Sequence, residues 1–439
     1  MKVITSILMC LIAIGSQAQH SISGNFSPAK DFKWLIAYEL APGSQRYVAD
    51  TAVNDGYFKL DLPANAAKGV YRLVYAVPQD EFYIDVIYNG KEDVAFNFNF
   101  EEGVSFTDSN ENITFNSYFS SISAIETKLV DFYQSEKSSK SEYSKIIKEL
   151  ATVQQGFETR SKGLLVHTFI TSNKSSIPST YEAVASYFNH KKEFYFKHIN
   201  LEDKVLQASG FLKDKLSNYA FSAIPLESTS QVEIEEAIKE NIKTIADKLE
   251  NTPGDFQVDI FHALWKIARE NKLTNVSGLV YSEHLKDLAI QNGQQQLIDE
   301  IEVQTRLSIG ALSPEITWEK NGVTNSLSNL SGAEYYILIF WSSTCSHCLK
   351  EIPALHKELA NYKNAKVVAV GLEDNEQNWI LESEKLPNFN HAITLEKWES
   401  EYAQLFAIQK TPTYFILDKD KRFVSKPEND KEVVAFLKN

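Results

Sequence analysis

One stretch near the C-terminus, residues 335–353, constrains the fold of this 439-residue chain more than any other part of it. It opens with the apolar run Tyr335–Trp341, which is short enough to be a fully buried strand. Three small polar residues follow, and then Cys345 and Cys348. Beyond the cysteines, apolar residues recur at helical spacing, at Leu349, Ile352, Leu355, Leu359 and Tyr362. The pattern therefore predicts a strand, a turn and a helix that begins at Cys345.

This placement gives the first cysteine a chemical advantage. A helix N-terminus carries unpaired N–H groups and a partial positive charge, and both stabilise a thiolate. The thiolate is the nucleophile in disulfide exchange. Cys348 lies one helical turn further on, where it is placed to resolve a mixed disulfide formed at Cys345.

The segment Phe340-Trp-Ser-Ser-Thr-Cys-Ser-His-Cys348 resembles the active site of the thioredoxin superfamily. The longer pattern Cys345-x-x-Cys348-x-x-Glu351-x-Pro353 is similar to that of the TlpA/ResA-like extracytoplasmic thiol-disulfide oxidoreductases. The resemblance covers about the last 130 residues. It implies that Thr411-Pro412, which directly precedes an apolar strand, forms the family's cis-proline loop opposite the cysteines. It also implies that Trp341, Thr411 and Pro412 shape a groove for an extended substrate peptide.

The acidic residues depart from the thioredoxin pattern. Ile339 stands where thioredoxins carry a buried acid, and Thr344 stands where a Trp often precedes the first cysteine. Glu351 matches an acidic position of the TlpA/ResA-like pattern, so we expect it to exchange a proton with Cys348. The alternative is a solvated helix glutamate with no role in catalysis.

His347 lies between the two cysteines. If protonated, it would stabilise the thiolate of Cys345 and make the couple more oxidising. The alternative is an exposed turn residue without effect on the sulfur.

The N-terminus predicts export. Lys2, the apolar run 3–14 and the small-x-small triplet at 16–18 are typical of a cleaved secretory signal over residues 1–19. We expect no lipid anchor at Cys10, because Leu8 and Met9 are not small. No later stretch is long and apolar enough to predict membrane insertion, so we expect an exported protein of the periplasm or another extracytoplasmic compartment.

Cysteine usage and charge narrow the chemistry. Of three cysteines, only Cys345 and Cys348 remain after signal removal, and a structural zinc site needs four ligands, so we expect neither a metal nor another cofactor. The net charge of −14 argues against nucleic acid as a partner.

The rest of the chain predicts two further domains. About seven short alternating strands separated by turn signals predict a β-sandwich over residues 20–111. Residues 112–309 have helical apolar spacing and no catalytic motif, which makes this α-helical region the best place for partner binding or an oligomer contact. Residues 310–439 predict an α/β thioredoxin-like domain, so the chain is expected to be multidomain.

The function that follows is a thiol-disulfide oxidoreductase, expected to act as a reductase on the thiols and disulfides of exported proteins with electrons from an unidentified donor. The alternatives are a disulfide oxidase or isomerase, a binding protein that retains the fold, and a peroxidase.

Overall fold

The computed structural model describes residues 20–135, 139–228 and 230–438, so the predicted signal at 1–19 lies outside the described residues. The chain divides into two compact units, Met1–Gly293 and Gln294–Asn439. The first contains the β strands of the N-terminal region and helices α1–α10, and the second contains α11 and a five-stranded sheet. The multidomain architecture predicted from the sequence, with β, helical and α/β parts in this order, is confirmed.

The N-terminal β region is a sandwich of two four-stranded sheets, ordered β4-β1-β7-β8 and β3-β2-β5-β6. The strands are β1 (Ser21–Ser27), β2 (Trp34–Ala41), β3 (Ser44–Ala52), β4 (Tyr57–Asp61), β5 (Gly69–Val74), β6 (Tyr83–Tyr88), β7 (Val94–Asn99) and β8 (Gly103–Asp108), with a short 3₁₀ turn at Ala29–Asp31. The strand that sequence patterning did not predict is β8. None of its side chains is fully buried, and its apolar alternation is limited to Val104 and Phe106.

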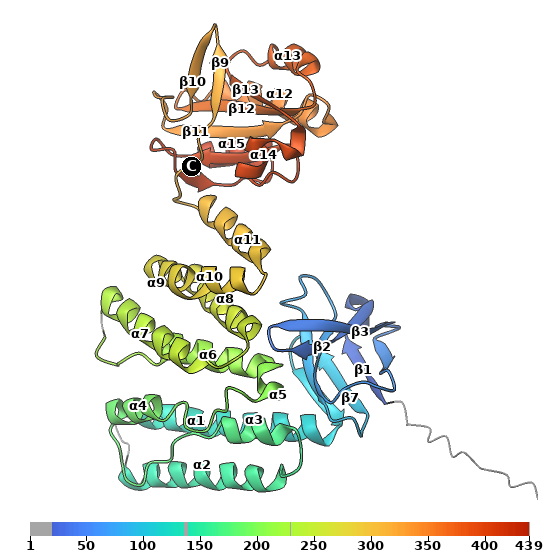
Figure 1. Cartoon of the computed structure of the whole chain (residues 1–439), viewed down its shortest axis with the longest axis vertical. Helices are drawn as coiled ribbons and strands as arrows, with labels where there is room; N and C mark the ends of the chain where they lie inside the picture. The colour runs from blue at the N-terminus through green and yellow to red at the C-terminus, as the bar shows by residue number, and fades with distance from the viewer. Residues whose placement is uncertain (1–19, 136–138, 229, 439) are drawn as a thin grey trace, which may run out of the picture. The chain divides into compact units, whose positions relative to one another are not determined.

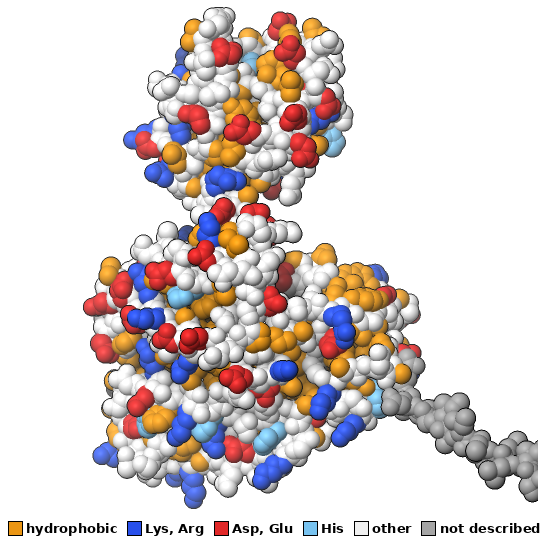
Figure 2. Space-filling view, viewed as in Figure 1, with side chains coloured by type: hydrophobic (Ala, Val, Ile, Leu, Met, Phe, Trp, Pro, Cys, Tyr) orange, Lys and Arg blue, Asp and Glu red, His pale blue; other side chains and the backbone are white. Residues whose placement is uncertain are grey.

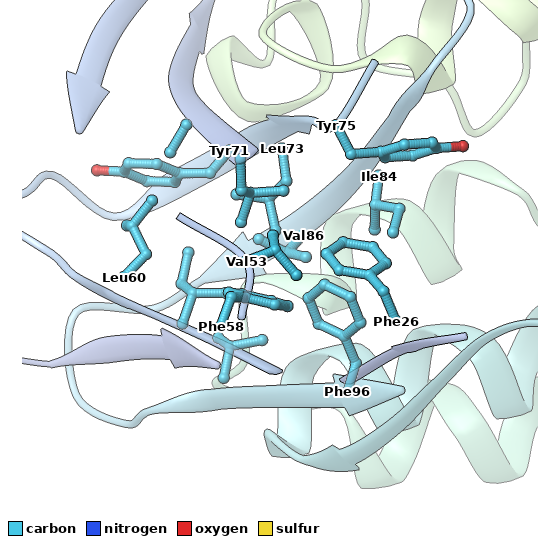
Figure 3. Packing of buried hydrophobic residues seen from close by; sticks show 14 of the residues in the cluster. Phe26, Val53, Phe58, Leu60, Tyr71, Leu73, Tyr75, Ile84, Val86 and Phe96 are labelled. Atoms are coloured by element: carbon cyan, nitrogen blue, oxygen red, sulfur yellow. The ribbon is translucent and has the colours of Figure 1, made fainter. Parts of the chain in front are cut away.

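Aromatic side chains fill the space between the two sheets. Phe26 packs against Phe58 and Phe96 with ring centroids 5.2 and 6.2 Å apart, and all three rings are almost fully buried. Figure 3 shows these rings meeting Val86 and Ile84 of the facing sheet. Burying such large apolar surfaces is the main favourable contribution to folding.

The helices of the first unit follow the sandwich in chain order (Figure 1). They are α1 (Asn110–Gln134), α2 (Lys140–Arg160), α3 (Val166–Ser172), α4 (Val184–Glu193), α5 (Lys204–Gln207), α6 (Gly210–Ser222), α7 (Gln231–Leu249), α8 (Gly254–Glu270), α9 (Thr274–Leu279), a π-helical turn at Val280–Leu285 and α10 (Lys286–Gln291).

Two buried side chains tie the start of α1 to its neighbours. The amide of Asn112 accepts from the N–H of Ile87 at 2.8 Å and donates to the Ile87 carbonyl at 2.7 Å. The carboxylate of Glu111 accepts from the N–H groups of Leu165 and Val166 at 3.1 and 2.9 Å, at the N-terminus of α3. These bonds join α1 to β6 and to α3 within the unit.

The second unit starts with α11 (Gln295–Arg306) and the hairpin β9 (Thr317–Lys320) and β10 (Val323–Ser326). Its main sheet has the order β13-β12-β11-β14-β15, made by β11 (Tyr335–Trp341), β12 (Ala365–Glu373), β13 (Asn390–Leu395), β14 (Thr413–Leu417) and β15 (Phe423–Ser425). Its helices are α12 (Ser346–Leu359), α13 (Gln377–Ser383), α14 (Glu401–Leu405) and α15 (Asp430–Lys438), with a 3₁₀ turn at Lys397–Glu399.

The central strand β11 is buried on both faces. Ile337, Ile339 and Trp341 pack toward Ile352 and Leu355 of α12 on one face of the sheet. The alternate residues Tyr336, Leu338 and Phe340 pack toward Ala403 and Phe406 on the other. A strand covered on both faces reads as an uninterrupted apolar run, which is the pattern observed in the sequence.

The sequence between β12 and Pro412 adds a strand to this sheet that patterning did not predict. The strand is β13, which pairs in parallel with β12 at the edge. It carries only one buried residue, Ala392, and therefore gives a weak apolar signal.

Acidic and basic side chains are interspersed on the face of both units that Figure 2 shows, without a continuous field of one sign. Among the described helices, none has the length and apolar character needed to cross a bilayer.

Candidate active site

Cys345 lies where the sequence predicts it, in the turn that joins β11 to α12. It is the N-cap residue of α12, with extended backbone angles of φ −88° and ψ 114°, and its sulfur accepts from the N–H of Cys348 at 3.2 Å. The sulfur therefore takes the place of the side-chain oxygen that usually caps a helix. Both cysteines are free, and Cys345 is partly exposed whereas Cys348 is fully buried.

Their environments separate the acidities of the two thiols. Burial raises the pKa of Cys345, but hydrogen bonds from Cys348, from the side chain of Thr411 and from the N–H of His347 outweigh it, so the pKa lies below the ordinary value for a thiol. Burial above all raises the pKa of Cys348 to about 12. Cys345 is thus the sulfur that is both more accessible and more readily ionised.

The loop before β14 faces the cysteines. The Thr411–Pro412 peptide bond is cis, and the Cys345 thiol donates to the Thr411 carbonyl at 3.4 Å. Both loop residues are partly exposed. Because β14 pairs directly with β11, the sheet itself holds this loop next to the end of the strand that leads to Cys345.

Glu351 lies on α12 and accepts from the hydroxyl of Tyr414 at 3.2 Å. Tyr414 is buried in the same apolar cluster as Cys348 and Trp341. Burial, followed by the charge of Glu351, raises the pKa of Tyr414 well above that of an ordinary phenol, so the phenol stays protonated as the donor. Glu351 therefore has a specific partner at the site.

His347 and Trp341 lie in different environments. The side chain of His347 is exposed and has no hydrogen bond or ion pair within the described part of the chain, and only its backbone N–H acts on Cys345. Trp341 is buried, and its indole N–H has no hydrogen-bond partner there. The ring packs against the site from β11 and does not line an open groove.

One buried carboxylate at the site was missed by sequence reasoning. Glu373, the last residue of β12, is only 2% exposed. It accepts from the N–H of Ser343 at 2.5 Å and from the hydroxyls of Ser342 and Ser343 at 3.2 and 3.0 Å. The signal available was an acid at the carboxyl end of an apolar strand, the end at which open α/β sheets place their sites.

Glu373 holds the turn that leads into Cys345. The turn is closed by the N–H of Cys345, which donates to the Ser342 carbonyl at 3.1 Å. Ser342 and Thr344 also share a hydrogen bond between their hydroxyls at 3.0 Å.

Among the described residues, no group of three or more His, Cys, Asp or Glu side chains could hold a metal ion.

Comparison with known proteins agrees with this geometry. Residues 332–423 match the family model described as thioredoxin-like, so this part of the chain is a thioredoxin-like domain. The match covers strands β11–β14, both cysteines, Glu373 and the Thr411–Pro412 loop, but not the first unit. No curated protein matches the chain.

Solved structures with similarity to this chain carry related descriptions. A domain of a possible thiol-disulfide isomerase from Cytophaga hutchinsonii is 26% identical, with 30% of this chain and 91% of that one covered and a TM-score of 0.27. The thioredoxin domain of a thiol-disulfide oxidoreductase from Bacteroides vulgatus is 23% identical, with 30% and 96% covered and a TM-score of 0.28. A thioredoxin-like protein from Bacteroides caccae is 18% identical, with 60% and 96% covered and a TM-score of 0.31. Because these TM-scores are low, the class of the domain rests on the family match and on the site.

Proposed function

We propose that this protein is a thiol-disulfide oxidoreductase of the TlpA/ResA-like kind that works in the reducing direction on exported proteins. The observation that carries the proposal is the pairing of an ionisable, partly exposed Cys345 at a helix N-cap with a buried Cys348 that has a high pKa. A nucleophilic and a resolving sulfur need these two environments.

The reaction follows from the two sulfurs. The Cys345 thiolate attacks a substrate disulfide, the S–S bond breaks, and the leaving thiolate takes up a proton. The Cys348 thiol then loses its proton and attacks the Cys345 sulfur of the mixed disulfide, which releases the second substrate thiol. Two electrons have passed to the substrate, and the protein holds a Cys345–Cys348 disulfide, which a dithiol donor must reduce again.

Glu351 is proposed to accept the proton of Cys348. A thiol whose pKa is about 12 needs a base to ionise at neutral pH. Tyr414, which donates to Glu351, lies in the apolar cluster that holds Cys348, so the pair provides a polar path beside the buried sulfur.

Thr411 and Pro412 are proposed to hold the substrate. Both are partly exposed, and the Thr411 carbonyl lies 3.4 Å from the Cys345 sulfur. An extended peptide that pairs with the backbone of this loop would bring its disulfide to Cys345.

We propose that the protein works as a reductase because a histidine side chain that would favour oxidation has little effect on Cys345 here. A protonated imidazole near the sulfur would stabilise the thiolate and raise the potential. The His347 side chain is exposed and does not contribute to the lowered pKa of Cys345. We therefore expect a potential near that of thioredoxin, about −270 mV, and far from the value of about −120 mV of the oxidant DsbA.

Insulin reduction by dithiothreitol, with the potential of the couple measured against glutathione, tests the proposal. The wild type should accelerate insulin reduction, Cys345→Ser should abolish the acceleration, and Ser346→Ala, an exposed neighbour, should retain it. A rate equal to that of dithiothreitol alone would reject the oxidoreductase. A potential near −120 mV would reject only the direction.

The remaining parts of the proposal come from the sequence. They are a signal peptide at 1–19, a sandwich at 20–111, a helical domain at 112–309 that would carry any oligomer contact, a redox domain at 310–439, and a function without metal or other cofactor.

A further inference from the structure

A cavity of about 640 Å³ lies within the first unit, between the sandwich and its helices. Strands β5, β6 and β8 form one side, and helices α1, α3 and α6 form the other. The volume falls within the range of small-molecule sites, about 300–1,000 Å³. Nothing in the redox mechanism uses it.

One wall of the cavity is aromatic. Phe115 packs against Phe119 and Phe169 with ring centroids 4.5 and 5.5 Å apart. Phe211 of α6 packs against Phe169 at 5.5 Å and against Phe119 at 6.2 Å. Phe115, Phe119 and Phe211 are only partly buried although each packs against other rings of the cluster, so part of each ring is left to face the cavity.

The same cavity contains an ammonium group without a counter-ion. The Lys215 side chain has no hydrogen bond or ion pair within the described part of the chain. Its Nζ lies 5.6 Å from the centre of the Tyr195 ring and 5.8 Å from that of Phe211. Lys191, by contrast, pairs with Glu126 at 3.0 Å. Together, Lys215, Lys191 and Glu126 carry one net positive charge.

The pKa of Lys215 is consistent with the absence of an ion-pair partner. Burial, together with the charge of Lys191, lowers the pKa of Lys215 to about 8, and Glu126 only partly opposes this shift. Lys215 is therefore mostly protonated at neutral pH, in a site where its charge is poorly solvated. A bound anion would supply the missing interaction.

Two further acidic side chains line the cavity. Asp85 pairs with Arg72 at 2.8 Å, and Asp214 has no ion pair in the described part of the chain. Both line the cavity, and burial raises the pKa of Asp214. These carboxylates would repel a second anionic group, so the lining favours a ligand with a single anionic group.

We infer that this cavity binds a small organic monoanion, with its aromatic or aliphatic body against the Phe115–Phe119–Phe211 wall and its acidic group on Lys215. The walls are already positioned, because Asn112 ties α1 to β6 and Glu111 ties α1 to α3. A preformed site binds without paying to order its walls.

Two fluorescent probes with the same aromatic body test the inference on the full chain. One is 1-anilinonaphthalene-8-sulfonate, and the other is the uncharged N-phenyl-1-naphthylamine. Lys215→Met should weaken the sulfonate by about tenfold or more and leave the uncharged probe within about twofold, because only the charged hydrogen bond is lost. Lys213→Met is the matched control on the same helix: Lys213 pairs with Asp259 at 2.8 Å and does not line the cavity, so neither probe should change.

Lys215→Arg keeps the charge and should restore the sulfonate affinity to within about threefold. Phe119→Ala should weaken both probes, whereas Phe188→Ala, an exposed ring outside the cavity, should weaken neither. Equal sulfonate binding by wild type and Lys215→Met, or equal loss of both probes in that variant, would overturn the inference.

The inference is independent of the redox proposal. Cys345→Ser should bind both probes as the wild type does, and Lys215→Met should reduce insulin at the wild-type rate. Loss of probe binding in Cys345→Ser would show that the probes report another site and would also overturn the inference.

Discussion

At the scale of single residues, the chemistry depends on how differently two nearby sulfurs are placed. Cys345 caps a helix and is partly exposed, whereas Cys348 points into the apolar cluster beneath β11. The N–H of Cys348 stabilises the sulfur of Cys345, and burial disfavours the thiolate of Cys348. The same helical turn therefore favours the thiolate of Cys345 and disfavours that of Cys348.

Alkylation should show this asymmetry. In the reduced protein at pH 7, iodoacetamide should label Cys345 first, because its pKa lies below the ordinary value whereas that of Cys348 is about 12. The labelling rate should rise with pH, with its midpoint below about pH 8.5, the ordinary pKa of a thiol. Peptide mass spectrometry assigns the label. Preferential labelling of Cys348 would reverse the assigned roles.

His347 should act through its backbone and not through its side chain. His347→Ala keeps the N–H that helps to lower the pKa of Cys345, so its thiolate titration should match that of the wild type. His347→Pro removes that N–H and should raise the pKa. Thiolate absorbance measures both variants. An equal rise of the Cys345 pKa in both variants would show that the imidazole, and not the backbone N–H, lowers this pKa. The proposed reducing direction would then lose its support.

Glu373 should stabilise the turn before Cys345. Glu373→Ala leaves the Ser343 N–H and two hydroxyls without their acceptor, which should cost about 1–3 kcal/mol of unfolding free energy in the reduced protein. Asp374→Ala is the matched control, since it removes only the surface pair with Lys397 and should cost under about 1 kcal/mol. Urea unfolding measures both. Equal losses would reject the role of Glu373.

At the scale of elements, helix α13 packs closely against strand β12 of the central sheet. Gly371 of β12 has no room for a side chain, because a Cβ atom there would lie 2.4 Å from the indole ring of Trp379 on α13. The glycine therefore lets α13 pack against the strand that ends in Glu373. Sequence reasoning had no means of finding this pair, which is eight residues apart and joined only by packing.

Gly371→Ala should destabilise the second unit by about 1–3 kcal/mol, since the added methyl overpacks a filled site. The same change made in a Trp379→Ala background should cost under about 0.5 kcal/mol, because the ring it would strike is gone. Denaturant unfolding of the four proteins gives the coupling energy. Additive losses would show that the ring does not limit the site.

At the scale of the whole molecule, each unit has its own apolar core. The two clusters around the five-stranded sheet contain only residues between 303 and 437, and the sandwich cluster contains only residues between 22 and 106. A unit with its own core satisfies the main requirement for independent folding.

A fragment of residues 294–439 should therefore fold and reduce insulin at close to the rate of the full chain. Far-UV circular dichroism and the turbidity assay check this, with the Cys345→Ser fragment as the control. A fragment that folds but lacks activity would show that the first unit takes part in the reaction, and the proposed confinement of the chemistry to the second unit would be wrong.

The sequence predicted the parts of this protein that depend on local order. The run 335–341, the spacing of the cysteines and the Thr411-Pro412 pair lie within short segments, and strand, helix and turn preferences act over such distances. The succession of β, helical and α/β regions followed from the same patterns. The edge strands β8 and β13 were missed, and neither has more than one fully buried residue.

The tertiary structure alone decided which distant residues meet. Glu373 reaches the turn before Cys345 because β12 pairs in parallel with β11, and Tyr414 reaches Glu351 from β14 on the other side of the same strand. The cavity with Lys215 depends on helices and strands that are more than a hundred residues apart in the chain. Residue spacing records neighbours along the chain, whereas pKa values and binding depend on neighbours in space, and these are fixed only when the sheets and helices pack.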